Sequence, residues 1–381
     1  MNSFIRKIKS NEGIIYSFVI MVTIKQLDTG RNNNFDLLRF IAATFVVFSH
    51  SFLLTGTYSA GPYAHVMQKL DLGGFGVDVF FAISGFLITK SMFRQPTLNG
   101  FVWARFLRIF PGLFGTAVFC AFVIGPICTT LPLKDYFSNK TVYAFIYQLT
   151  TLHNYSNYLP ATFEQNPYPG SMNSPMWTLP TELLMYLGVL LCGVILLIWK
   201  RYFKGLIMTL PVLVIVGLYF KDMHYSADYM IFVHSFATIF LLGAICYLLS
   251  SKMVLSLPIL LGLFVVWLIF SNFKIPVFFY PRLVVYAFYV LLVYGILFFA
   301  YHPKLQVKSF HKLGDYSYGL YIYAFPIQQL MVSKAGLLNP FVHFICTFPL
   351  ALVVAALSWH FIEKPMLSLK TLSFFTKANR V

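Results

Sequence analysis

Ten long apolar stretches run through the sequence, and most of them reach the roughly 20 residues that an α-helix needs to cross a bilayer. Only 10% of the residues are charged, whereas soluble domains carry roughly 25%. The stretches lack the alternation of period two that membrane barrels show. The sequence therefore predicts an all-α, polytopic integral membrane protein with about ten transmembrane helices, and it excludes a soluble enzyme, a secreted disulfide scaffold and a disordered chain. The expected helices cover residues 37–56, 72–93, 109–132, 177–199, 205–220, 229–250, 253–271, 283–301, 316–333 and 337–362.

The positive charges are distributed unevenly between the loops. The formal net charge is +16, and when the ten helices alternate from a cytoplasmic N-terminus, 20 of the 28 Lys and Arg residues fall on the cytoplasmic side and 7 on the other. This bias follows the positive-inside rule, so we expect both termini in the cytoplasm. Because the basic residues are spread over many loops and form no continuous stripe, we expect no nucleic-acid partner.

The chain is expected to have three parts. Residues 1–34 form a cytoplasmic segment, in which an apolar run at 14–24 is too short to span and is predicted to be an amphipathic helix. Residues 35–363 form the transmembrane domain, and residues 364–381 form a cytoplasmic tail.

One outer loop, residues 133–176, is much longer than the others, and loops of this length are usually functional. It is rich in Tyr, Asn and Pro and carries few charges, a mixture of flat aromatic faces and amides that suits a sugar surface. A loop that only packs over the helix ends would have a similar composition, and both interpretations remain open at this point.

The first expected helix carries two ionisable residues, Arg39 and His50. His50 lies eleven positions after Arg39, so both side chains lie on one helix face, about 16 Å apart along the axis. Ionisable groups within membrane spans are costly and usually face a cavity or a partner. A buried, hydrogen-bonded structural histidine is the alternative interpretation for His50.

Two carboxylates are expected near the level of His50, in the outer half of the membrane. Asp78 lies in the second helix and Glu182 in the fourth, each a short way below the outer surface. A carboxylate beside a histidine holds its tautomer and raises its basicity, as a general base requires. Alternatively, Asp78 and Glu182 cap helix ends or pair with Arg282 or Lys274.

A cluster of cations is expected on the cytoplasmic side. Arg105 and Arg108 are three residues apart, so they share a helix face at the start of the third span. With Arg39, Lys90 and Arg94 they form a set suited to a multiply phosphorylated ligand, because arginine makes bidentate contacts with phosphate. Alternatively, arginines at the end of a membrane span only set its orientation or face the lipid headgroups. The five cysteines lie in apolar stretches without a Cys-x-x-Cys pair, so we expect no metal site.

Together these motifs resemble acyltransferase family 3, the integral membrane O-acyltransferases that modify bacterial surface polysaccharides. The resemblance covers nearly the whole chain and rests on six motifs in the family's order. They are Phe35-Asp-Leu-Leu-Arg39 followed after ten residues by His50, Gly76-Val-Asp-Val-Phe-Phe-Ala-Ile-Ser84-Gly85-Phe86, Arg105-Phe-Leu-Arg108, Trp177-Thr-Leu-Pro-Thr-Glu182, Ser317-Tyr-Gly-Leu-Tyr-Ile-Tyr323 and Phe361-Ile-Glu363-Lys-Pro365.

The resemblance implies an acyl-CoA co-substrate, usually acetyl-CoA, no permanently bound cofactor, and a sugar acceptor beyond the bacterial inner membrane. The acceptor would be a surface polysaccharide, such as O-antigen, or its lipid-linked precursor. It also implies that His50 is catalytic, that Glu182 belongs to the active site, and that Arg39, Arg105 and Arg108 serve the acyl-CoA or its path. We further expect Asp78, by its level in the membrane, to be a catalytic candidate beside His50, and Ser84 to lie on the acyl-CoA side. Two departures from the family pattern are expected to matter: no histidine follows the Ser317 motif closely, and we expect no esterase-like domain after the last span.

Two functions of different classes fit these residues. In an acyltransferase, His50 takes the proton of a sugar hydroxyl, or forms a transient acyl-histidine, and the sequence does not separate the two routes. In a proton-coupled secondary transporter, His50, Asp78, Glu182 and Arg39 would form a proton relay around a midplane site.

Overall fold

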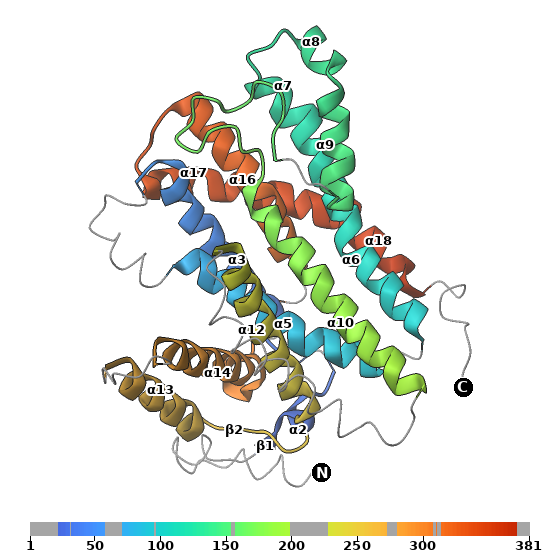
Figure 1. Ribbon diagram of the computed structural model, residues 1–381, viewed down its shortest axis with the longest axis vertical. Coiled ribbons are helices and arrows are strands. Elements are labelled where there is room, and N and C mark those ends of the chain that lie inside the picture. The colour runs from blue at the N-terminus through green and yellow to red at the C-terminus, as the bar shows by residue number, and fades with distance from the viewer. Residues whose placement is uncertain are drawn as a thin grey trace. The chain divides into compact units, whose positions relative to one another are not determined.

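In the computed structural model, residues 22–30, 32–57, 71–94, 97–153, 157–198, 228–272, 280–307, 310 and 314–371 are described, and they are predominantly helical (Figure 1). Within these ranges the only sheet is a two-stranded antiparallel ribbon, β1 (Val22–Thr23) with β2 (Val254–Leu255). The all-α fold class is confirmed.

Six helical segments of the described chain are long and apolar enough to cross a membrane. Two shorter apolar helices, Phe232–Leu248 and Leu257–Asn272, fall on further predicted spans. The helix over the predicted span 316–333 is also present, but it is more polar. The predicted span 205–220 lies outside the described residues, as does the predicted amphipathic helix at 14–24 except for its last three residues, where Val22–Thr23 form a strand instead. The total of ten spans and the side of the termini therefore stay predictions. The six segments are Phe35–Leu54, Leu72–Arg94, Leu98–Cys128, Ser174–Ile195, Leu283–Tyr301 and Pro340–Ser368.

The chain divides into two compact units. The first contains residues 1–38, 81–90 and 204–310. In it, Asp28 pairs with Lys90 and accepts a hydrogen bond from Tyr301 Oη at 3.0 Å. Gly85 packs so closely that an added Cβ would collide with the backbone of Phe240. The helices of this unit are α2 (Ile24–Leu27), α12 (Asp228–Leu248), α13 (Leu257–Asn272) and α14 (Tyr280–Tyr301), with the middle of α5 (Leu72–Arg94).

The second unit contains residues 39–80, 91–203 and 311–381, and it holds most of the predicted site residues. Its helices are most of α3 (Phe35–Leu54), the ends of α5, α6 (Leu98–Phe119), α7 (Gly125–Cys128), α8 (Leu133–Ser138), α9 (Lys140–Thr151), α10 (Thr178–Ile198), α16 (Tyr316–Ala335), α17 (Pro340–Ser358) and α18 (Lys364–Ser368). Short π-helical turns, Cys120–Ile124 and Trp359–Glu363, join α6 to α7 and α17 to α18.

Helix α16 lies beside α3 and α6 and runs in the same direction as both. Along α3, Arg39 pairs with Asp315, just before α16, and His50 further on contacts Phe325. Arg108 of α6 also pairs with Asp315, and Tyr318 Oη donates to the carbonyl of Ile109 at 2.8 Å. The contacts advance together along each pair of helices, so the three helices are parallel.

Two helices run against α16. Thr178 of α10 hydrogen-bonds Tyr321, whereas Glu182, one turn later, interacts electrostatically with Tyr318, one turn earlier. In α17, Ala355 packs against Gly319, where an added Cβ would meet Ala355 at 2.9 Å. This close approach is typical of small residues between membrane helices. These five helices have the relative directions that the predicted alternation requires.

Two predicted boundaries differ from the structure. The third span was expected from residue 109, but α6 begins at Leu98, which puts Arg105 and Arg108 two to three turns inside the helix. The start was wrong because arginines normally mark a span's end, whereas here carboxylates of other helices offset the charge of Arg108. The helical chain that begins with α17 also continues past residue 363, through α18.

The described part of the long loop is folded. Helix α9 lies beside α6, and its buried side chains include Phe145 and Leu149 (Figure 1). The segment 157–173 packs on α16, where the buried Gln329 donates through Nε2 to the carbonyls of Tyr168 and Ser171 at 2.8 and 2.9 Å. These contacts favour the packing interpretation for this part of the loop, although Glu164 and Gln165 stay exposed.

Candidate active site

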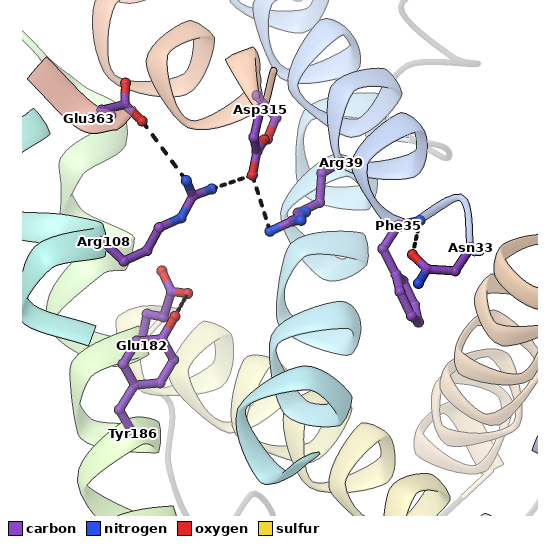
Figure 2. A network of polar contacts seen from close by, with 9 residues as sticks. Asn33, Phe35, Arg39, Arg108, Glu182, Tyr186, Asp315 and Glu363 are labelled. Carbon is purple, nitrogen blue, oxygen red and sulfur yellow. Dashed lines mark hydrogen bonds and ion pairs between the residues drawn. The ribbon is translucent and has the colours of Figure 1, made fainter. Parts of the chain in front are cut away.

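Asp315 lies just before α16 and joins two arginines from different helices. Its Oδ2 is 2.5 Å from Arg108 Nη2 and 3.4 Å from Arg39 Nη1. On its other side, Arg108 Nη1 is 3.9 Å from Glu363 Oε2. Figure 2 shows the guanidinium groups of Arg39 and Arg108 converging on the one carboxylate. We call Arg39, Arg105 and Arg108 the arginine cluster.

The arginine cluster is largely withdrawn from solvent. The Asp315 side chain is 12% exposed and that of Arg108 is 18% exposed. Burial alone would raise the pKa of the Asp315 carboxyl, but the guanidinium groups of Arg108 and Arg39 outweigh burial and hold this pKa below its ordinary value. A hydrogen bond from Ser317 Oγ to Oδ1 adds to the effect. Asp315 is therefore a stable anion that fixes two cations at one end of α16.

Arg105 brings Glu182 into the same region. It lies one turn before Arg108 on α6, and it interacts electrostatically with Glu182 and Tyr186 of α10. Glu182 accepts a hydrogen bond from the Tyr186 hydroxyl (Figure 2). Within the described residues, the buried Nε of Arg105 makes no hydrogen bond. The structure thus places Glu182 with the arginine cluster.

His50 lies halfway along α16 from the arginine cluster. Its half-buried ring packs edge-on against Phe325, with ring centroids 5.2 Å apart. Ten residues separate Asp315 from Phe325, or about 15 Å of helix, which agrees with the separation of Arg39 and His50 along α3. The arginine cluster and His50 therefore lie at different levels along the same pair of parallel helices.

Asp78, one of the two carboxylates predicted to orient His50, makes no hydrogen bond or ion pair with it among the described residues. Asp78 of α5 is half-buried, and Asp71 is the charged group that interacts with it. Ser84, expected on the acyl-CoA side, lies on the part of α5 that belongs to the first unit. Lys90, grouped near the arginines by topology, pairs with Asp28 there.

Comparison with known proteins identifies the chain. The family model of acyltransferase family 3, described as an acyltransferase domain, matches residues 32–360. The chain belongs to acyltransferase family 3. As a member of acyltransferase family 3 with several apolar helices, it is a multi-pass membrane acyltransferase.

Two curated relatives match almost end to end. One is the O-acetyl transferase of Shigella phage Sf6, 28% identical over 349 residues, which cover 89% of this chain and 97% of the phage protein. The other is Nodulation protein 10 of Rhizobium leguminosarum bv. viciae, 28% identical over 365 residues, which cover 90% and 95% of the two chains. No solved structure matches.

Several residues of this acyltransferase family 3 site could not be found from sequence. Asp315 is a lone acid before a helix, where a capping role is the ordinary interpretation. Gln328 is fully buried in α16 and donates to the carbonyl of Val47 and to Ser51 Oγ at 2.9 and 2.8 Å, which fixes α3 beside α16 at the level of His50. The one sequence signal was two adjacent glutamines inside an apolar helix.

The charged side chains of the site are three arginines and the carboxylates of Asp315, Glu363 and Glu182. No group of three or more His, Cys, Asp or Glu residues capable of holding a metal ion occurs in the described part of the chain. Guanidinium groups are common protein partners of anions such as phosphate.

Proposed function

We propose that the protein is an O-acetyltransferase of the bacterial inner membrane, which moves an acetyl group from cytoplasmic acetyl-CoA to a sugar hydroxyl. The acceptor is a cell-surface polysaccharide or its lipid-linked precursor on the outer side. One observation carries the proposal: the arginine cluster and His50 lie about 15 Å apart along the same pair of parallel helices. The name of the phage relative, an O-acetyl transferase, supports the acyl group and the type of bond.

The donor is proposed to bind by its phosphates at the arginine cluster. Guanidinium groups bind phosphate as they bind carboxylate, through short charge-assisted hydrogen bonds. Arg105 offers a buried Nε with no hydrogen bond inside the described chain. The extended pantetheine arm then follows the helices toward His50 and delivers the thioester to the middle of the membrane domain.

At His50 the acetyl group is transferred from the CoA sulfur to the acceptor oxygen. A ring nitrogen removes the proton of the acceptor hydroxyl as the oxygen attacks the thioester carbonyl. The new C–O ester bond forms, the C–S bond breaks, and the thiolate of CoA leaves and takes the proton from the imidazolium. A route through acetyl-His50 uses the same atoms in two steps, with the imidazole nitrogen as the first nucleophile.

Glu182 is proposed to act on the donor side of this path. Its electrostatic partner is Arg105 and its hydrogen bond comes from Tyr186. It therefore orients the arginine cluster. Asp78 remains the candidate carboxylate for orienting His50, because its position in the second helix puts it at the expected level of the imidazole.

Turnover of acetyl-CoA by the purified protein tests the function. Detergent-solubilised wild-type protein should release free CoA thiol and transfer labelled acetyl groups to surface polysaccharide. His50→Ala should lose transfer by about 10²–10⁴-fold, the usual contribution of a general base, yet remain in the membrane. His153→Ala, in an exposed part of the loop, is the matched control. Full activity of His50→Ala would overturn the assignment, and a wild-type protein that binds no acetyl-CoA would favour the transporter.

A further inference from the structure

A cavity of about 270 Å³ opens at the end of α16 opposite the arginine cluster. Ala161 and loop residues 163–167 line one side of it, and Val332, Ser333, Gly336 and Leu337 line the other. Seventeen residues separate Asp315 from Val332, or about 26 Å along the helix. The cavity and the arginine cluster are therefore almost a bilayer's hydrocarbon thickness apart.

The lining combines a buried apolar part with an exposed polar rim. Phe163 and Val332 are buried, at 3% and 4% exposed. Exposed polar side chains surround them, namely Thr130, Glu164, Gln165 and Ser333. A sugar ring has the matching surfaces, since its C–H faces pack on aromatic and aliphatic groups while its hydroxyls donate to carboxylate, amide and hydroxyl oxygens.

The backbone of this wall is held in an unusual conformation. Ala161 and Phe163 have φ angles of +52° and +56°, a region that side chains other than glycine rarely occupy. Hydrogen bonds hold both residues in place: Thr130 N donates to the carbonyl of Ala161 and Gly170 N to that of Phe163, each at 3.0 Å. Such conformations persist only where the surroundings impose them, and they gather at ligand sites.

The cavity is separated from His50 by packed side chains. Leu54, Phe325 and Val332 form one buried cluster, against which Tyr168 packs. Phe325 contacts His50, whereas Val332 lines the cavity. Val332 lies seven positions after Phe325, about 10 Å along the helix, so a ring in the cavity cannot present its own hydroxyl to His50.

We infer that this cavity is an acceptor subsite, which binds one sugar ring of a glycan chain while a neighbouring ring of the same chain reaches His50. The inference rests on the proposed function and names the acceptor class more closely: a chain of at least two linked sugars. The volume supports one ring, since pockets for drug-sized ligands measure roughly 300–1,000 Å³. Free monosaccharides are then poor acceptors, because they cannot use the subsite.

Two variants that fill the cavity from opposite sides test the inference, Ser333→Trp and Thr130→Trp. Both positions are exposed, so the larger side chain has room without repacking the core. Ala335→Trp is the matched control, because Ala335 is equally exposed on α16 but does not line the cavity. The probes are oligosaccharides released by mild acid from the surface polysaccharide of a bacterium that carries the gene, and the monosaccharides obtained by complete hydrolysis.

The expected result is a loss of chain-length preference. Wild type and Ala335→Trp should acetylate oligosaccharides with a kcat/KM about tenfold or more above that for monosaccharides, the effect of one or two extra hydrogen bonds. Ser333→Trp and Thr130→Trp should lower the oligosaccharide value to the monosaccharide value, with acetyl-CoA hydrolysis in the absence of sugar unchanged. Filled variants that keep the preference overturn the subsite. A wild type that neither hydrolyses nor transfers acetyl groups overturns the proposed function instead, and in that case direct binding of the oligosaccharides to wild type and filled variants still tests the subsite.

Discussion

Arg108 and Asp315 form an ion pair at 2.5 Å although 207 residues separate them in the chain. The pair joins α6 to the start of α16 at the point where Arg39 also contacts the carboxylate. Each arginine has a counter-charge, which lowers the free-energy cost of placing a guanidinium group inside an apolar helix. Asp315 is thus a positioning residue for the arginine cluster.

Replacing Asp315 by Asn should destabilise the protein by about 3 kcal/mol, because two largely buried guanidinium groups lose their shared anion. The melting temperature of the solubilised protein measures this. Asp135→Asn, at an exposed position of α8, should leave the melting temperature unchanged. Equal melting temperatures for wild type and Asp315→Asn would show that the carboxylate does not stabilise the two guanidinium groups in the folded protein.

The stabilisation by Asp315 should depend on pH in one direction. Because the pKa of this carboxyl is lower in the folded protein than its ordinary value of about 3.9, its contribution is complete above that ordinary value and is lost as the pH falls through the folded-state pKa. The difference in melting temperature between wild type and Asp315→Asn should therefore be constant from neutral pH down to about pH 5 and shrink in stronger acid. A difference that grows on acidification would contradict the sign.

Arg105→Gln and Arg108→Gln should each raise the KM for acetyl-CoA by roughly 10- to 100-fold, the effect of losing a hydrogen bond to a charged group. The KM for the acceptor should not change, because the acceptor reaches His50 from the other end of α16. Lys252→Gln, which removes an exposed charge, controls for net charge. Steady-state kinetics with each substrate varied in turn separates the two constants, and an effect on the acceptor alone would refute a donor role.

Phe325→Leu should lower kcat roughly three- to tenfold, because the edge-on contact that orients the His50 ring disappears while most of the apolar volume remains. The KM for acetyl-CoA should stay as in the wild type. Phe348→Leu removes a comparable ring contact from α17 and should leave kcat unaffected. A change in KM with constant kcat would place Phe325 on the binding path instead of beside the reacting group.

The sequence predicted the helices well and their partners poorly, for a physical reason. Apolarity over some 20 residues is a local property, so the bounds of α3 and α5 were predicted to within two residues. The start of α6 was missed because Arg108 has counter-charges, and these come from the far end of the chain. No local pattern records such a pairing.

The candidate site was predicted in the same uneven way. The Arg39–His50 face follows from helix geometry alone, and the structure keeps both residues on α3 and along α16. Glu182 was expected at the depth of His50, since depth was counted from the helix end, yet its side chain interacts with Arg105. Depth along a helix fixes a level only when the tilt and packing of its neighbours are known. The roles of His50, Asp78, Ser84 and Glu182 stay predictions.

The π-helical turn at Trp359–Glu363 has a consequence for how this helix tolerates changes in length. Lys364 N donates to the carbonyl of Trp359, five residues earlier, so the turn holds one residue more than an α-helical turn would. Each residue of an α-helix adds about 100° of rotation. Deleting a single amino acid here would leave an unbroken, equally apolar helix but would swing Glu363 away from Arg108. In this segment the residue count itself, as much as the residue types, determines which charges meet.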